Sequence, residues 1–217
     1  MTDEEIENGI QQLSDEDFGK QLIALGRLVG AGEAAVPRLF VALARDPEAR
    51  TYIVFALAGI ASRDSEVIQA SISFWEANLT DPLLNQALLS WVKKLAAPIA
   101  PQNIAALTCF LGCWRKHSVV VDDSVRHTVG TSLSTIAAQA LASLSYSHPT
   151  TELLLVLPYM KGSHFLNGVP PQIETARKTI ERNTAHMKDL PRIAEAPKIS
   201  DKLPLPADAS KGSEENQ

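Results

Sequence analysis

The strongest constraint on the fold is a pair of apolar quartets that repeat one spacing on either side of a short break. Members of each quartet follow one another at i, i+4, i+7 and i+11, which places them on one face of an α-helix. Asp81-Pro82 stands between the quartets and interrupts the helical pattern. Two consecutive helices joined by a tight turn are therefore predicted. The quartets are Ile68, Ile72, Trp75 and Leu79, then Leu84, Leu88, Trp91 and Leu95.

Helical spacing continues along most of the chain, and no useful period-2 alternation interrupts it. One helix is expected after Asp15 and another with Pro37 in its first turn, where the missing N–H costs nothing. A long helix is expected through residues 131–147, which lack Gly and Pro, and a charged one over about 172–186. We predict an all-α fold of about ten helices.

Three turns share a pattern in which an Asp is followed four residues later by Arg or Asn. An Asp at a helix N-cap accepts backbone N–H groups and suits the positive end of the helix dipole. The later side chain could reach back to that Asp or to the Asp of a neighbouring repeat. The intervals between the Asp residues, 35 and 41, are typical of helical arrays. The pairs are Asp46 with Arg50, Asp81 with Asn85, and Asp122 with Arg126.

Residues 21–63 resemble the HEAT-like repeat of phycobilisome lyases and their relatives, an armadillo-type repeat. The matching segments are Ala24-Leu-Gly-Arg-Leu-Val-Gly30, Ala35-Val-Pro-Arg-Leu39, Leu43, Asp46, Ala49-Arg50 and Ala56-Leu-Ala-Gly-Ile60. The second hairpin lacks the Pro, and Asn85 stands where the family has Arg. The resemblance implies a short right-handed α-solenoid of antiparallel helical hairpins, because one repeat alone cannot cover its apolar face. We assign this domain to residues 1–188.

The two ends of the chain differ from this body. Residues 189–217 spread four prolines among charged and small residues, so they bury too little apolar area and are predicted to be disordered. Residues 1–12 are expected to be only loosely helical.

The net charge of −5 is distributed unevenly along the chain. Residues 1–17 carry −7, residues 18–170 carry +2, and residues 171–217 are neutral overall. A body at +2 does not predict strong phosphate binding, which needs a clustered basic face, so no nucleic-acid partner is expected.

Several classes of protein are not expected from this sequence. No apolar stretch is long enough to span a membrane, and the acidic start is unlike a secretory signal. Cys109 and Cys113 alone do not indicate a secreted disulfide scaffold. We predict a soluble, cytoplasmic protein without membrane insertion.

Cys109, Cys113 and His117 are the most distinctive candidate ligands, spaced i, i+4 and i+8 on one predicted helix, with His127 early on the next. Thiolates and imidazoles can hold zinc or iron. However, positions i and i+8 lie about 12 Å apart along a helix axis, too far for one tetrahedral ion. We therefore interpret the cysteines as small core residues and predict no metal.

No sequence signature of catalysis is present. The nucleophile elbow, the Cys–His signature and the phosphate-binding glycine loop are all missing, so we predict a protein that is not an enzyme and has no cofactor. Trp75, Trp91 and Trp114 could form an aromatic binding stripe, but their helical spacing with Ile and Leu favours core packing.

The function predicted is a non-catalytic interaction or scaffold module that binds a protein with an acidic or mixed-charge surface. Two alternatives remain: a lyase- or chaperone-like factor for a tetrapyrrole-binding protein, implied by the resemblance alone, and a helical-repeat DNA-binding or repair protein. In the first interpretation, exposed charges on the helices after Asp46, Asp81 and Asp122 contact the partner. An apolar tip in the loop 161–171 is a second candidate contact. The partner-binding candidates are Arg50, Lys93, Lys94, Arg126, Phe165 and Leu166.

Overall fold

The computed structural model describes residues 1–113, 124–161 and 169–187, with the side chains of 124–127 outside the description. This part of the chain is helical and contains no strand, so the all-α prediction is confirmed. Short 3-10 turns extend or precede several helices. The α-helices are α1 (Asp3–Gln12), α2 (Phe18–Ala31), α3 (Val36–Arg45), α4 (Arg50–Ile60), α5 (Ser65–Ala77), α6 (Pro82–Ala96), α7 (Ile104–Phe110), α8 (Ser124–Ser147), α9 (Thr151–Val156) and α10 (Pro171–Asn183).

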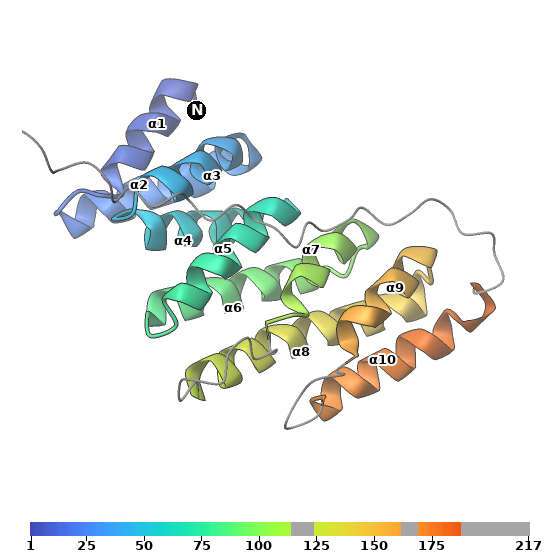
Figure 1. The fold of residues 1–217 in the computed structure, drawn as a ribbon. Coiled ribbons are helices and arrows are strands. Elements are labelled where there is room, and N and C mark those ends of the chain that lie inside the picture. Colours follow the sequence, from blue (N-terminus) through green and yellow to red (C-terminus); the bar gives the residue numbers. More distant parts are fainter. Residues whose placement is uncertain (114–123, 162–168, 188–217) are drawn as a thin grey trace, which may run out of the picture.

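The helices are arranged in two rows that alternate along the chain (Figure 1). In the first row, which we call the even row, α2 packs on α4, α4 on α6, α6 on α8 and α8 on α10. The odd row is less continuous: α1 contacts α3, α5 contacts α7, and α7 contacts α9. Figure 1 shows the chain advancing from α1 and α2 at one end of the molecule to α10 at the other.

The core lies between the two rows and contains the apolar quartets. Trp75 on α5 and Trp91 on α6 are fully buried, which confirms that both belong to the core. Each indole N–H has a partner: Trp75 Nε1 donates to Asn85 Oδ1 at 2.6 Å, and Trp91 Nε1 donates to Ser62 O at 2.9 Å. Buried indoles need such partners, so neither Trp side chain leaves a polar group unpaired in the core. Trp114 lies outside the described residues.

Helix ends follow the local chemistry of the sequence. Asp17 is the N-cap of α2, and its carboxylate accepts from the backbone N–H of Gly19 at 2.8 Å. The long predicted helix is α8, which starts seven residues earlier than its Gly-free and Pro-free segment. α9 ends at Val156, and the chain continues as a 3-10 turn because Pro158 has no N–H for an α-helical bond.

The expectation of a loose N-terminus is wrong, because α1 is a regular helix from Asp3 to Gln12. A capping box starts it: Thr2 Oγ1 accepts from Glu5 N–H, and Glu5 Oε2 accepts from Thr2 N–H. That second bond is the main reason why the pKa of Glu5 is lowered. Ile6, Ile10 and Leu13 are at most 1% exposed, so α1 is part of the core. The prediction gave weight to the acidic residues and overlooked these three apolar residues, which follow one another at helical spacing.

The turn between α3 and α4 also differs from the prediction. Asp46 is the C-cap of α3 and does not cap α4, whose N-cap is Ala49 without a side-chain bond. Arg50 does not reach Asp46 either. Its guanidinium donates to the carbonyl oxygens of Leu43 at 2.9 Å and Ala44 at 3.1 Å, and it satisfies the end of α3.

The turn between α5 and α6 follows the prediction more closely. Asp81 caps α6 by accepting from the N–H groups of Leu83 at 2.8 Å and Leu84 at 3.4 Å. Its other oxygen accepts from Thr51 Oγ1 of α4 at 2.9 Å. Asp81 is therefore linked to the preceding hairpin, as predicted for an Asp of a neighbouring repeat. The residue that makes the link is Thr51, next to the predicted Arg50. Asn85 reaches back to Leu79 O at 3.3 Å, as Arg50 does to Leu43 O.

Two predicted segments cannot be compared with the structure. The C-terminal tail, 189–217, and most of the loop 161–171 lie outside the described residues. Within the described part, no helix is both long enough and apolar enough to cross a lipid bilayer.

Candidate interaction surface

Two of the predicted partner-binding residues have structural partners. Lys94 Nζ donates to the carbonyl oxygens of Gly59 at 2.8 Å and Ala58 at 3.3 Å, at the end of α4. Arg50 is half-buried between the end of α3 and the ring of Phe74, whose centroid lies 5.7 Å from the guanidinium carbon. Both cations thus complement helix C-termini. They add positive charge to the surface, and both already donate to backbone carbonyls.

Lys93 is the predicted residue that the structure presents most openly. It is exposed on α6, and within the described part its ammonium has no hydrogen bond or ion pair. Gln86, two turns earlier on α6, is exposed as well, so both mark the solvent side of this helix. Arg126 lies in α8, but its side chain is outside the described residues, as are Phe165 and Leu166.

The even row has a charge pattern that the net charges of consecutive segments of the chain did not reveal. The four helices α2, α4, α6 and α8 contain no Asp or Glu. α10 contains acids, but Glu174 and Glu181 are both bonded to Arg177, and the pKa of Glu174 is lowered mainly by that bond. The basic positions of the acid-free helices are Lys20, Arg27, Arg50, Lys93, Lys94 and Arg126.

The odd row has the opposite balance. Its helices contain seven acids, four of them in α1, and two basic residues, Arg38 and Arg45 of α3. Some of these charges cancel along the chain, because α5 carries two acids and the following helix, α6, carries two lysines. The signal could have been found by adding the charges of every second predicted helix.

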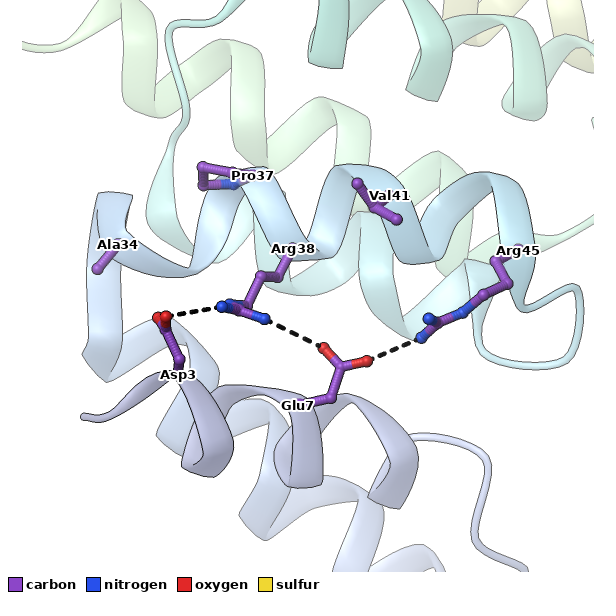
Figure 2. Close-up of a pocket in the computed structure, with 7 residues that line it drawn as sticks. All are labelled: Asp3, Glu7, Ala34, Pro37, Arg38, Val41 and Arg45. Carbon is purple, nitrogen blue, oxygen red and sulfur yellow. Dashed lines mark hydrogen bonds and ion pairs between the residues drawn. The ribbon is translucent and has the colours of Figure 1, made fainter.

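An open cavity of about 460 Å³ lies between α1 and α3 (Figure 2). Four side chains form a line of alternating charge along it. Arg38 lies 2.7 Å from Asp3 and 3.8 Å from Glu7, and Arg45 lies 3.0 Å from Glu7. Because each charge already has a partner and each pair is solvated, the network adds little stability and offers no open charge to a ligand.

A second concavity, of about 570 Å³, lies between α8 and α10 and is lined by uncharged side chains. Tyr146 is 65% exposed at this site, and its hydroxyl accepts from Arg182 at 3.1 Å. Serine, threonine and glutamine side chains line the rest. Tyr146 is the titratable side chain of this lining, and no carboxylate, imidazole or thiol lines it in the described part of the chain.

The cysteine stripe does not form as predicted. α7 ends at Phe110, and Cys113 lies in the turn that follows, so Cys109 and Cys113 are not on one continuous helix. Cys109 is half-buried, its thiol donates to Ala105 O at 3.4 Å, and burial raises its pKa. No cluster of three or more His, Cys, Asp or Glu residues suited to a metal occurs in the described part. His117 and the His127 side chain fall outside it.

Comparisons with known proteins give no match: no family model, no curated protein and no solved structure is similar to this chain.

Proposed function

We propose that the chain is a short right-handed α-solenoid of HEAT-like antiparallel hairpins that acts as a non-catalytic interaction module. It binds an acidic segment of another protein across the even row. The acid-free sequence of α2, α4, α6 and α8 is the observation that carries this proposal.

The succession of contacts supports the repeat architecture. Each even helix packs on the next one, and α3, α5 and α7 each contact the even helix that follows. α4 and α6 are tied at both ends, by Thr51 with Asp81 at one and by Lys94 with Gly59 at the other. Such nearest-neighbour packing is what stacked helical hairpins require.

The positive charge of the even-row helices supports an acidic segment as the partner. Helices α2, α4, α6 and α8 contain no carboxylate between their caps, so along their length an acidic segment meets positive charge and no like charge, whereas a basic segment meets like charge. Complementary charge mainly raises the association rate and selects among partners. The basic residues are few and several are bound to carbonyls, so contacts with the polar and apolar residues between them must supply much of the affinity.

Binding of two matched peptides tests this proposal. We expect a helix-forming peptide rich in Glu to bind in fluorescence anisotropy, and its counterpart with Lys at every Glu position not to bind. Lys93→Glu should weaken binding of the acidic peptide several-fold, chiefly through the association rate. Lys161→Glu is the matched control, because Lys161 is also exposed but lies outside the even row.

The outcomes separate the alternatives. Equal binding of both peptides, or equal loss with Lys93→Glu and Lys161→Glu, would contradict a charge-selective even row. Salt-dependent binding of duplex DNA without binding of the acidic peptide would favour a nucleic-acid partner instead. The tetrapyrrole-linked role, implied by the resemblance of residues 21–63 alone, would show as altered pigment absorbance on mixing.

A further inference from the structure

The concavity between α8 and α10 has a lining with two chemical parts. Figure 1 shows these two helices side by side at the end of the even row. Ala142 of α8 and Ala176 of α10, 8% and 4% exposed, are the least exposed residues of the lining and form an apolar floor. Tyr146 adds a ring that is 65% exposed. The more exposed glutamine, serine and threonine side chains form a polar rim.

The polar groups of this rim are open to a ligand. Gln139 and Ser143 lie one turn apart on α8, and Gln172 and Thr179 lie two turns apart on α10. In the described part of the chain, none of these four side chains makes a hydrogen bond. Each amide offers two N–H donors and an acceptor, and each hydroxyl offers a donor and an acceptor. A ligand can therefore make several hydrogen bonds here without displacing a contact within the protein.

Charge is largely neutralised around the concavity. Glu174 and Glu181 of α10 are both bonded to Arg177, and Arg182 donates to the Tyr146 hydroxyl at 3.1 Å. A strongly charged ligand would lose hydration at this lining without gaining a counter-ion. An apolar ligand would cover amides and hydroxyls and leave them unpaired. The lining therefore favours a neutral ligand that carries many hydroxyl groups.

A sugar ring has the two kinds of surface that this lining matches. A pyranose presents C–H groups on its faces and hydroxyl groups around its edge. Packing the C–H face on the Tyr146 ring removes apolar surface from water. The edge hydroxyls can then exchange hydrogen bonds with the amides and hydroxyls of the rim. A peptide rich in serine and threonine also exchanges hydrogen bonds, but it has no flat C–H face to place on the ring.

We propose that the concavity between α8 and α10 binds a neutral hexose oligosaccharide, with one sugar ring packed on Tyr146 and its hydroxyl groups hydrogen-bonded to the glutamine, serine and threonine side chains of the rim. This site does not depend on the acidic segment proposed above as the partner of the even row. The concavity is open and its floor is small, so binding is weak, with a Kd in the high micromolar to millimolar range.

Saturation-transfer-difference NMR with defined trisaccharides tests the proposal, because it detects weak binding and reports which ligand protons touch the protein. The neutral probes are maltotriose, cellotriose and mannotriose, and the charged probe is trigalacturonic acid. We expect at least one neutral trisaccharide to bind, with the largest transfer to its ring C–H protons. Trigalacturonic acid should show no transfer, because the lining offers no counter-ion for its carboxylates.

Four variants locate the binding site. Tyr146→Ala should abolish the transfer, whereas Tyr146→Phe, which retains the ring, should keep most of it. Gln139→Ala should weaken binding several-fold. Gln86→Ala is the matched control, because Gln86 is also an exposed helical glutamine but lies on α6, outside the concavity. Circular dichroism should give similar melting temperatures for all four, since the changes are on the surface.

The remaining outcomes contradict the proposal. Absence of transfer to every neutral trisaccharide would overturn it, and so would tighter binding of trigalacturonic acid. Equal binding by wild type and Tyr146→Ala, or equal losses in Gln139→Ala and Gln86→Ala, would place the contact elsewhere. A peptide rich in serine and threonine that binds wild type but not Tyr146→Ala, while no trisaccharide binds, would assign the concavity to a protein partner instead.

Discussion

At the scale of single residues, identical residue types have opposite roles in neighbouring helices. Gly59 is enclosed by Val29, whereas Gly26 faces open solvent. Lys94 is bonded to two carbonyls of α4, whereas the adjacent Lys93 is open. The sequence alone does not separate such pairs, because helical periodicity places a residue on a face but does not say which neighbour that face meets.

Gly59→Ala should destabilise the protein by about 1–3 kcal/mol, because the new methyl group would overlap Val29 and force α2 away from α4. Urea unfolding followed by circular dichroism measures this cost. Gly26→Ala is the matched control and should leave the free energy of unfolding unchanged or raise it. An equal loss in both variants would mean that helix packing does not explain Gly59.

Lys94→Ala should lower the stability by up to about 1 kcal/mol, since the last carbonyls of α4 lose a cationic partner. Lys93→Ala should stay within about 0.5 kcal/mol of wild type, as exposed substitutions do. Thermal melting of the two variants at low salt compares them directly. Two equal losses would show that the carbonyl contact contributes nothing.

Cys109 should react slowly with a thiol reagent at neutral pH. Burial raises its pKa, so less of the reactive thiolate is present than for a free cysteine at the same pH. A Cys113→Ala variant isolates the Cys109 signal, and the rate in urea gives the unfolded reference. A native rate equal to the unfolded one would contradict the burial argument.

Elemental analysis of the same protein tests our prediction that no zinc or iron binds stoichiometrically.

At the scale of elements, apolar spacing predicted where helices lie but not how they end. The helices around Trp75 and Trp91 were predicted from spacing alone, because burying an apolar stripe leaves few alternatives. Caps depend on the conformation of one or two residues. Asp46 and Asp81 occupy similar sequence positions, yet only Asp81 is an N-cap. The single-helix interpretation of the cysteines failed for the same reason, since α7 ends at Phe110.

The two turn aspartates should therefore differ when each is replaced. Asp81→Ala should cost about 1–2 kcal/mol, because α6 loses its cap and Thr51 loses its acceptor. Asp46→Ala should have little effect, because within the described part of the chain its carboxylate contacts only the exposed Arg45, at 3.4 Å. Urea unfolding of both variants checks the difference. A larger loss from Asp46→Ala would contradict the caps described here.

At the scale of the whole molecule, the candidate surface was harder to predict than the fold. The near-neutral body indicated no charged face, because seven of its ten acids lie in the segments between the α-helices and offset the basic residues of the even row. Grouping the charges by row separates four acid-free helices, α2, α4, α6 and α8, from a row in which acids outnumber basic residues. Tertiary contacts decide which helices share a layer, and local periodicity contains no information about them.

Helices α2, α4, α6 and α8 carry six basic residues and no acid, whereas the odd-row helices carry seven acids and two basic residues, and this separation contributes an electric dipole moment to the molecule. A polyanion approaching in solution experiences a torque from that dipole before any atoms touch, and the encounter is biased toward orientations in which the even row faces it. Salt at about 1 M shortens the range of this field to about 3 Å, so it should reduce the frequency of productive collisions far more than the lifetime of the bound state.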